Sequence, residues 1–298
     1  MIKRIRELKD GFAFVISDLQ GNRSDFERVL NLYYYHRKIG ECKYLIICGD
    51  LIHGYFGYQD ESFYILNKLV QLSKEDTNII YLMGNHELSH LMHWNLKKGA
   101  QHFTENFEED LKVNRSFYWR FLNNLPFAVF TQGGLVINHS GASKALAGKA
   151  NEKWDLFFKI NSRSQWYKEL DFEASFGIQE FQKNYWDPKF GLHTLDTAEG
   201  KILWEIFMNK NELQYGQEYE TIVEGFLTTM AEIAPANILI SGHLQALDGF
   251  KIVNHKHFRI CTSYGASNEK LKKYLLLPTD QRFRSAHELL PFTRNLWN

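Results

Sequence analysis

The chain has 298 residues and a mass of 35.1 kDa, which suits one large α/β domain or two smaller domains. Its 44% hydrophobic and 23% charged residues are typical of a packed globular protein and exclude wholesale disorder and low-complexity structure. The 35 basic and 35 acidic side chains cancel, so no overall charge draws the protein to nucleic acid, and any polyanion must be recognised locally.

The sequence carries neither a disulfide framework nor an apolar segment of membrane-spanning length. Its three cysteines are too few for such a framework, and Cys48 lies in an apolar run where a buried thiol is expected. The N-terminal segment MIKRIRELKDGFAFVISD has no apolar stretch of signal-peptide length, and no run approaches the ~20 residues that span a bilayer. We therefore expect a soluble, cytoplasmic protein with no membrane partner.

Five short apolar runs, rich in Ile, Leu and Val, predict buried β-strands. They span residues 12–17, 44–48, 78–83, 135–138 and 237–241. Apolar side chains at helical spacing lie in residues 24–37, 62–74 and 115–124. The first three runs and the helices between them alternate as β-α-β-α-β, which predicts an α/β layered fold with largely parallel central strands.

The second half of the chain breaks this alternation. Residues 145–192 are rich in Phe, Tyr and Trp among many charges, and they predict an inserted, mostly helical segment. Residues 202–230 predict a second helical region, and residues 258–262 and 271–277 predict strands of a second sheet. Because no repeat and no flexible linker is visible, we expect residues 1–298 to form a single domain.

Each predicted strand ends at a side chain that can bind a metal ion. The five are Asp18 after FVIS, Asp50 after LIICG, Asn85 after IYLMG, His139 after LVIN and His243 after ILISG. The ends of parallel strands meet at one edge of a sheet, so we expect these side chains to converge. Asp and Asn alone are common turn formers, but histidine is not. With Gly49, Gly84 and Gly242 allowing close backbone approach, the pattern predicts a site for two divalent cations.

The segments that carry these residues resemble the successive blocks of the calcineurin-like metallophosphoesterases. They read SDLQGN, GDLIHG, GNHE, NHSGAS and SGHLQALDG. Their order and spacing, with FLNNLPFAVF and ILWE between them, are most similar to those of the phosphoprotein phosphatase (Ser/Thr phosphatase) family, over most of residues 10–278 apart from the aromatic insert. The resemblance implies a central β-sandwich flanked by helices and the hydrolysis of a phosphate ester.

The resemblance also implies roles for individual residues. The implied ligands are Asp18 and Gln20 for a first ion, Asp50 as a bridge, and Asn85, His139 and His243 for a second ion. A bridging carboxylate is physically reasonable because its two oxygens offset the charge between cations ~3.5–4 Å apart. Such a pair makes hydroxide from water and polarises the phosphoryl oxygens. His86 is similar to the family's general acid or electrostatic stabiliser at the leaving oxygen.

Gln20 departs from the family pattern, which has histidine at that place. An amide oxygen replaces an imidazole nitrogen, and oxygen ligands suit Mn²⁺ or Mg²⁺ better than Zn²⁺ or Fe. We therefore expect two divalent metal ions and a weaker first site, with Mn²⁺ preferred and Fe, Zn²⁺ or Mg²⁺ as alternatives.

The two arginines that grip a phosphomonoester in the family are also absent. This chain has His53 and Gly54 where the family has Asp-Arg, and Met83 where a second Arg precedes GNHE. Losing two bidentate guanidinium contacts weakens monoester binding. The candidate substitutes as substrate-binding residues are Arg23, Arg163 and Arg259.

His53 replaces the Asp that orients the general acid in the family, and three roles are open to it. It can be the partner of His86, coordinate the first metal in compensation for Gln20, or sit exposed at the surface. We count it with His86 as a candidate catalytic residue.

Residues 86–90 also fit the zinc-protease motif H-E-x-x-H. That motif needs both histidines inside one helix, whereas His86 comes directly after a predicted strand and a Gly-Asn turn. The context therefore favours a phosphoesterase, with structural roles for His90 and His93.

The sequence thus predicts a dinuclear metal-dependent phosphatase acting on a phosphorylated small molecule, a nucleotide or a phosphoprotein. A phosphodiesterase or dinucleotide pyrophosphate hydrolase is the alternative that the missing arginines suggest. An alternative of another class is a catalytically silent metal-binding module, suggested by Gln20 and His53.

Overall fold

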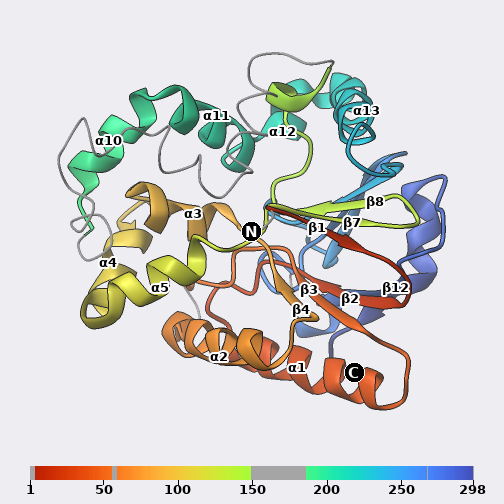
Figure 1. Cartoon of the computed structure of the whole chain (residues 1–298), viewed down its shortest axis with the longest axis horizontal. Helices are drawn as coiled ribbons and strands as arrows, with labels where there is room; N and C mark the ends of the chain where they lie inside the picture. The colour runs from red at the N-terminus through yellow and green to blue at the C-terminus, as the bar shows by residue number, and fades with distance from the viewer. Residues whose placement is uncertain (1–3, 56–58, 149–185, 267, 298) are drawn as a thin grey trace.

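The computed structural model describes residues 4–55, 59–148, 186–266 and 268–297, and within them two β-sheets form the centre of the molecule (Figure 1). The larger sheet contains, in spatial order, β1 (Ile5–Leu8), β7 (Ala128–Thr131), β8 (Leu135–Asn138), β9 (Ile238–Ser241), β11 (His257–Ile260) and β10 (Phe250–Asn254). The other sheet contains β13 (Thr293–Asn295), β12 (Lys273–Pro278), β2 (Phe12–Ile16), β3 (Tyr44–Ile47) and β4 (Ile79–Tyr81). A small hairpin pairs β5 (Lys97–Lys98) with β6 (Gln101–His102).

Helices cover the outer faces of this sandwich. The α-helices are α1 (Arg23–Lys38), α2 (Ser62–Glu75), α3 (Asn85–Met92), α4 (Phe103–Leu111), α5 (Arg115–Leu122), α10 (Pro188–Asp196), α11 (Ala198–Phe207), α12 (Asn211–Tyr215) and α13 (Tyr219–Met230). Short 3₁₀ turns lie at Lys112–Asn114, Lys144–Leu146, Gly216–Glu218, Glu269–Leu271 and Ala286–Phe292. Figure 1 shows α1 and α2 along the face of β2, β3 and β4, and α13 on the opposite side of the sandwich.

The alternation of side-chain direction along each strand explains why the molecule has one apolar core between the sheets and another beneath the helices. In β2, Ala13 and Val15 belong to the apolar core between the two sheets, whereas Phe14 and Ile16 pack in the separate core beneath the helices. Successive side chains of a strand point to opposite faces, so a run that is apolar at every position is buried on both. The continuous apolar runs in the sequence therefore correspond to strands between a sheet and a helical layer.

The five predicted strands and the helices predicted at residues 24–37, 62–74 and 115–124 are present, with ends shifted by a few residues at most, and the helical region predicted at 202–230 consists of α11, α12 and α13. The parallel pairings β2–β3, β3–β4, β8–β9 and β9–β11 confirm the largely parallel centre. The predicted elements do not, however, lie around one sheet. Strands β8 and β9 belong to the larger sheet, so the metal-ligand candidates come from two sheets whose ends meet.

Two other expectations need correction. The strands predicted at residues 258–262 and 271–277 do not form a sheet of their own, because β11 joins β9 and β12 joins β2. Strands β1, β7, β10 and β13 and helices α3 and α4 were not predicted individually. Most of the predicted aromatic insert, residues 149–185, lies outside the described residues, and helix α10 follows it. Among the described helices, none combines the length and apolar character needed to cross a membrane.

Ile46 offers a test of the core between the sheets, where its side chain is fully buried. We expect Ile46→Ala to lower the free energy of unfolding by about 2–5 kcal/mol, because it removes buried apolar contacts and leaves a cavity. Urea unfolding followed by circular dichroism measures this change. Val113→Ala is the control, since Val113 is 91% exposed and its truncation should change stability by no more than ~0.5 kcal/mol. Equal effects of the two substitutions would contradict the layer assignment.

Candidate functional site

The ends of strands from both sheets meet at one rim, where the predicted ligands come together. The ring Nδ1 of His139, after β8, lies 2.6 Å from the carbonyl oxygen of Cys48, directly after β3. One ligand atom from each of Asp50, His139 and His243 lies within 4.8 Å of the others. The site is therefore assembled across the sandwich, and neither sheet forms it alone.

Glycines make this close approach possible, as the sequence predicted. A Cβ atom on Gly242 would lie 1.8 Å from Ser17 Oγ and 2.3 Å from Asp18 Oδ2. A Cβ on Gly84 would lie 2.3 Å from Asp50 Oδ1, and one on Gly49 would lie 2.7 Å from the Cα of Gly84. No side chain fits at these three positions without moving a candidate ligand or its supporting loop.

Backbone strain is concentrated at the same rim. Six described non-glycine residues have positive φ, in a region that L-amino acids rarely adopt. Five are candidate site residues, namely Asp18 (54°), Gln20 (44°), Asp50 (51°), His53 (71°) and His243 (72°). Such strain persists only where the surrounding structure enforces it, and it clusters at functional sites.

Hydrogen bonds fix the orientation of the two histidine ligands. A carbonyl oxygen can only accept, so His139 donates Nδ1–H to Cys48, and His243 donates Nε2–H to the carbonyl of Asn209 at 3.0 Å. The opposite nitrogens, His139 Nε2 and His243 Nδ1, face each other at 3.2 Å, and each lies 2.9 Å from Asn85 Oδ1. In these tautomers both rings direct lone pairs at one point, the arrangement by which second-shell partners orient metal ligands.

The carboxylates make this point attractive to positive charge. Asp50 Oδ2 lies 3.3 Å from His139 Nε2. Burial disfavours the charged form of His139, but the charges of Asp50 and Asp18 outweigh burial and raise the pKa of His139 to about 9. Burial opposes the ionised form of Asp50 as well, yet His139 and His86 lower its pKa. The negative charges of Asp50 and Asp18 that favour a proton on His139 would also favour a metal cation at this point.

Asp18 supplies a further unsatisfied oxygen. Its Oδ2 accepts hydrogen bonds from the backbone N–H of His243 at 3.0 Å and from the Ser17 hydroxyl, whereas its Oδ1 is buried without a hydrogen-bond partner among the described residues. Burial, with repulsion from Asp50 and against attraction by His139, raises the pKa of Asp18 to about 7. A buried carboxylate oxygen without a donor is suited to a metal ion.

The residues at the rim therefore fit divalent metal ions. Asp18, Asp50, Asn85, His139 and His243 are joined by the contacts given above, and Gln20 lines the cavity of about 690 Å³ that opens beside them. Oxygen donors outnumber nitrogen donors in this set, which suits hard or borderline cations.

The two described arginine candidates lie in different places. Arg259 lines the cavity together with Lys97, Lys210 and Lys251, and it forms an ion pair with Glu212, which Lys251 also contacts at 2.8 Å. Burial lowers the pKa of Arg259 to about 10, so it stays charged at neutral pH.

Arg23, by contrast, is exposed outside this cavity. Its Nε pairs with Glu27 at 2.9 Å, and its guanidinium lies 3.9 Å from the ring centroid of Tyr64. The third candidate, Arg163, lies outside the described residues.

His53 contacts His86, which was one of its three predicted roles. The two Nδ1 atoms lie 2.9 Å apart, and His53 Nε2 lies 2.8 Å from His90 Nε2. The ring is buried, so it is not a surface residue, and both of its nitrogens already have imidazole partners. His86 itself lines the metal cavity, with Nε2 at 3.7 Å from Asp50 Oδ2.

The residues of the H-E-x-x-H motif make structural contacts in this protein. The sequence argument against a protease, that His86 lies outside the helix, is however wrong. Helix α3 begins at Asn85, so His86 and His90 do lie in one helix. They share His53 between them, and the Glu87 carboxylate accepts backbone N–H groups of Asp50 (2.9 Å), Gly84 (3.0 Å) and Leu51 (3.1 Å). Glu87 is thus a scaffold for two ligand loops, a role that sequence reasoning missed.

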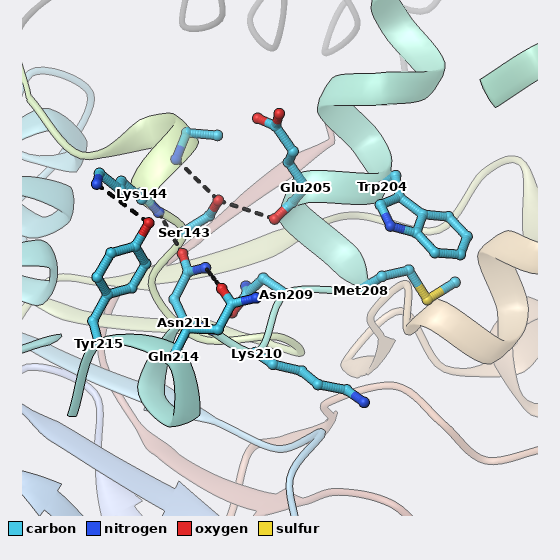
Figure 2. A pocket seen from close by; sticks show the side chains of 11 residues that line it. Ser143, Lys144, Trp204, Glu205, Met208, Asn209, Lys210, Asn211, Gln214 and Tyr215 are labelled. Carbon is cyan, nitrogen blue, oxygen red and sulfur yellow. Dashed lines mark hydrogen bonds between the residues drawn. The ribbon is translucent and has the colours of Figure 1, made fainter. Parts of the chain in front are cut away.

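A second cavity, of about 570 Å³, adjoins the first and shares Trp204, Met208 and Lys210 with it. Figure 2 shows its polar side chains bonded to one another. Lys144 Nζ donates to the Tyr215 hydroxyl at 3.2 Å, and other bonds link Asn211 to Gln214 and Ser143 to the carbonyl of Glu205. This cavity therefore adds room beside the metal cluster rather than a second set of reactive groups.

The fold and the donor set define an α/β protein built around a metal centre. Residues 13–246 match the family model described as calcineurin-like phosphoesterase, and the chain belongs to that family of metal-dependent hydrolases of phosphate esters. No match was found among curated proteins.

Solved structures of phosphatases share the fold. A cold-active protein tyrosine phosphatase is 14% identical with a TM-score of 0.54, over 93% of this chain and 76% of that chain. A cold-active protein-tyrosine phosphatase of a psychrophilic Shewanella species is 14% identical with a TM-score of 0.52, over 94% of this chain and 78% of that chain. At such identities the likeness describes the architecture alone.

The scaffold role of Glu87 can be tested by Glu87→Gln. One carboxylate oxygen becomes an NH₂ group that faces backbone N–H donors, so the loops that carry Asp50 and Asn85 must shift. We expect the affinity for Mn²⁺ to fall about ten- to hundredfold while the fold is retained. Isothermal titration calorimetry measures the affinity, with Glu109→Gln as the control because that side chain is 73% exposed. Unchanged affinity in folded Glu87→Gln protein would refute the assignment.

Proposed function

We propose that this protein is a dinuclear metal-dependent phosphatase that prefers Mn²⁺. The observation that carries the proposal is the convergence of carboxylate, amide and imidazole groups at one buried rim, where the carboxylates favour positive charge. Asp18 and Gln20 would hold a first ion, Asn85, His139 and His243 would hold a second, and the Asp50 carboxylate would serve both. When bound, the two ions supply acidified water as nucleophile and polarise the phosphoryl oxygens.

The chain's own residues orient the ester and its leaving group. Lys210, Lys251 and Arg259 give the cavity cationic side chains for an anionic substrate. His86 lies on the same wall, where as the doubly protonated imidazolium it can donate its Nε2–H to the ester oxygen as the bond from phosphorus to that oxygen breaks, leaving neutral imidazole with its proton on Nδ1. The products are the free alcohol or phenol and inorganic phosphate.

A phosphodiester or dinucleotide substrate is the second candidate. Gly54 carries no side chain and Met83 is fully buried, so neither position supplies the guanidinium group that a monoester dianion would favour. Arg259, the arginine that the described residues place in the cavity wall, is already paired with Glu212. A diester carries less negative charge and needs less neutralisation.

Asp50→Asn tests the metal-dependent mechanism. We expect hydrolysis of p-nitrophenyl phosphate with Mn²⁺ to fall by about a hundredfold or more, since the bridge loses its charge. Chelation by EDTA should abolish activity in the unmodified protein, and added Mn²⁺ should restore it. Asp10→Asn is the matched control, because its side chain is 79% exposed. Full activity after chelation, or in Asp50→Asn, would overturn the proposal.

Comparison of p-nitrophenyl phosphate with bis(p-nitrophenyl) phosphate at equal concentration separates the two substrate classes. A large excess of monoester turnover supports the phosphatase, and the reverse supports the diesterase. Bound metal with no turnover of either ester would instead indicate a binding module.

A further inference from the structure

A line of buried polar side chains leads from His86 away from the metal cavity. His86 Nδ1 meets His53 Nδ1 at 2.9 Å, and His53 Nε2 meets His90 Nε2 at 2.8 Å. His90 Nδ1 then lies 2.7 Å from Glu108 Oε1, and Glu108 Oε2 accepts Nε–H of Arg115 at 2.7 Å. All five side chains are buried, so the line is a continuous path of hydrogen bonds through the interior.

Four separate segments supply this line. His86 and His90 are one turn apart on α3, Glu108 lies on α4, and Arg115 begins α5. His53 follows β3 and has a φ of 71°, a strained backbone that places its ring between the two α3 histidines. The aromatic rings of Phe103 and Phe107 pack against it, with centroids 5.9 and 5.7 Å away. The arrangement thus depends on tertiary packing and not on one local motif.

The chemistry of the groups fixes the direction of every bond. The carboxylate of Glu108 can only accept, so His90 carries its proton on Nδ1 and presents a lone pair at Nε2. His53 must then donate from Nε2, which leaves its Nδ1 as an acceptor for His86 Nδ1–H. The Nε2 of His86 is thereby directed to the metal cavity.

Charge balance favours this direction over the reverse. Arg115 already pairs with Glu108 and also donates to the carbonyl of His90 at 3.0 Å. The reverse direction needs a second proton on His90, which adds an unbalanced buried charge beside Arg115. Burial, with repulsion from His86 and His90, also lowers the pKa of His53 well below its ordinary value, so His53 stays neutral and able to accept.

We propose that Glu108, His90 and His53 form a relay that positions and polarises His86, with Glu108 as a remote carboxylate acting through two neutral imidazoles. The proposal rests on the proposed function, in which His86 protonates the leaving oxygen. The three residues touch neither substrate nor metal, and they are positioning residues.

The tautomers of His86, His90 and His53 can be measured directly in metal-free protein, so this test does not depend on enzymatic activity. Long-range ¹H–¹⁵N correlation spectra distinguish Nδ1–H from Nε2–H imidazoles, and single His→Gln variants assign the signals. We expect Nδ1–H in His86 and His90 but Nε2–H in His53. In Glu108→Gln, Arg115 holds the amide oxygen and the NH₂ group faces His90, so all three tautomers should reverse. The reversed pattern in the unmodified protein would overturn the proposal.

Leaving-group dependence supplies the kinetic test. Phenyl phosphate needs a proton donor at its leaving oxygen, whereas 2,4-dinitrophenyl phosphate leaves without one. We expect Glu108→Gln and His90→Gln to lower kcat for phenyl phosphate by about tenfold or more, and to leave kcat for the dinitrophenyl ester nearly unchanged. Equal loss for both esters would show a structural role only. Glu105→Gln is the control, since Glu105 lies in α4 like Glu108 but forms only an exposed pair with His102 (2.9 Å).

A rescue variant tests the position of the carboxylate. Asp Oδ1 and His Nδ1 are both bonded to Cγ, so Asp at position 53 can accept His86 Nδ1–H directly. His53→Asp added to Glu108→Gln should recover phenyl phosphate hydrolysis, whereas His53→Ala should not, and equal behaviour of the two would count against the relay. If the unmodified protein with Mn²⁺ hydrolyses neither ester, the proposed function fails, and the tautomer spectra still decide the hydrogen-bond direction.

Discussion

The site depends on one electrostatic constraint, which is the gathering of carboxylate, amide and imidazole groups around a buried point that favours positive charge. His139 and His243 give their N–H groups to carbonyl oxygens behind them, so their lone pairs and Asn85 Oδ1 crowd together. Asp50 adds negative charge to the same point. A cation at this point would offset the buried negative charge, so under the proposed function metal binding and the closure of the two sheets would stabilise each other.

The surrounding structure holds these groups in place at a cost in local conformation. Asp18, Asp50 and His243 adopt positive φ, and three glycines allow backbones to approach where no Cβ fits. Glu87 uses both carboxylate oxygens to fix the loops after β3 and β4. The apolar core between the sheets offsets this strain, because it anchors each strand immediately before its ligand.

Sequence reasoning located the strands and the rim residues because both follow local rules. Apolar runs such as LIIC can be recognised from the amino-acid sequence alone, and the residue after such a run lies at the end of a strand. The sheet that each strand joins is a long-range property, and the apolar runs at residues 135–138 and 237–241 do not by themselves show that β8 and β9 belong to the larger sheet. The partners of His53 are open to sequence reasoning for the same reason, since His86 lies 33 residues and His90 lies 37 residues further along the chain. Nothing local distinguished buried Arg259 from exposed Arg23.

The position of Glu108 has an electrostatic consequence for the cavity. A carboxylate in direct contact with His86 would add a negative charge beside Asp50 and oppose an anionic ester. Here the acceptor that contacts His86 is neutral, and the negative charge lies two imidazoles away, balanced by Arg115. His86 keeps a partner that fixes its ring, while the field at its Nε2 stays more positive. In a cavity that lacks the usual pair of arginines, this placement would retain positive potential where the proposed function requires a phosphate ester to bind.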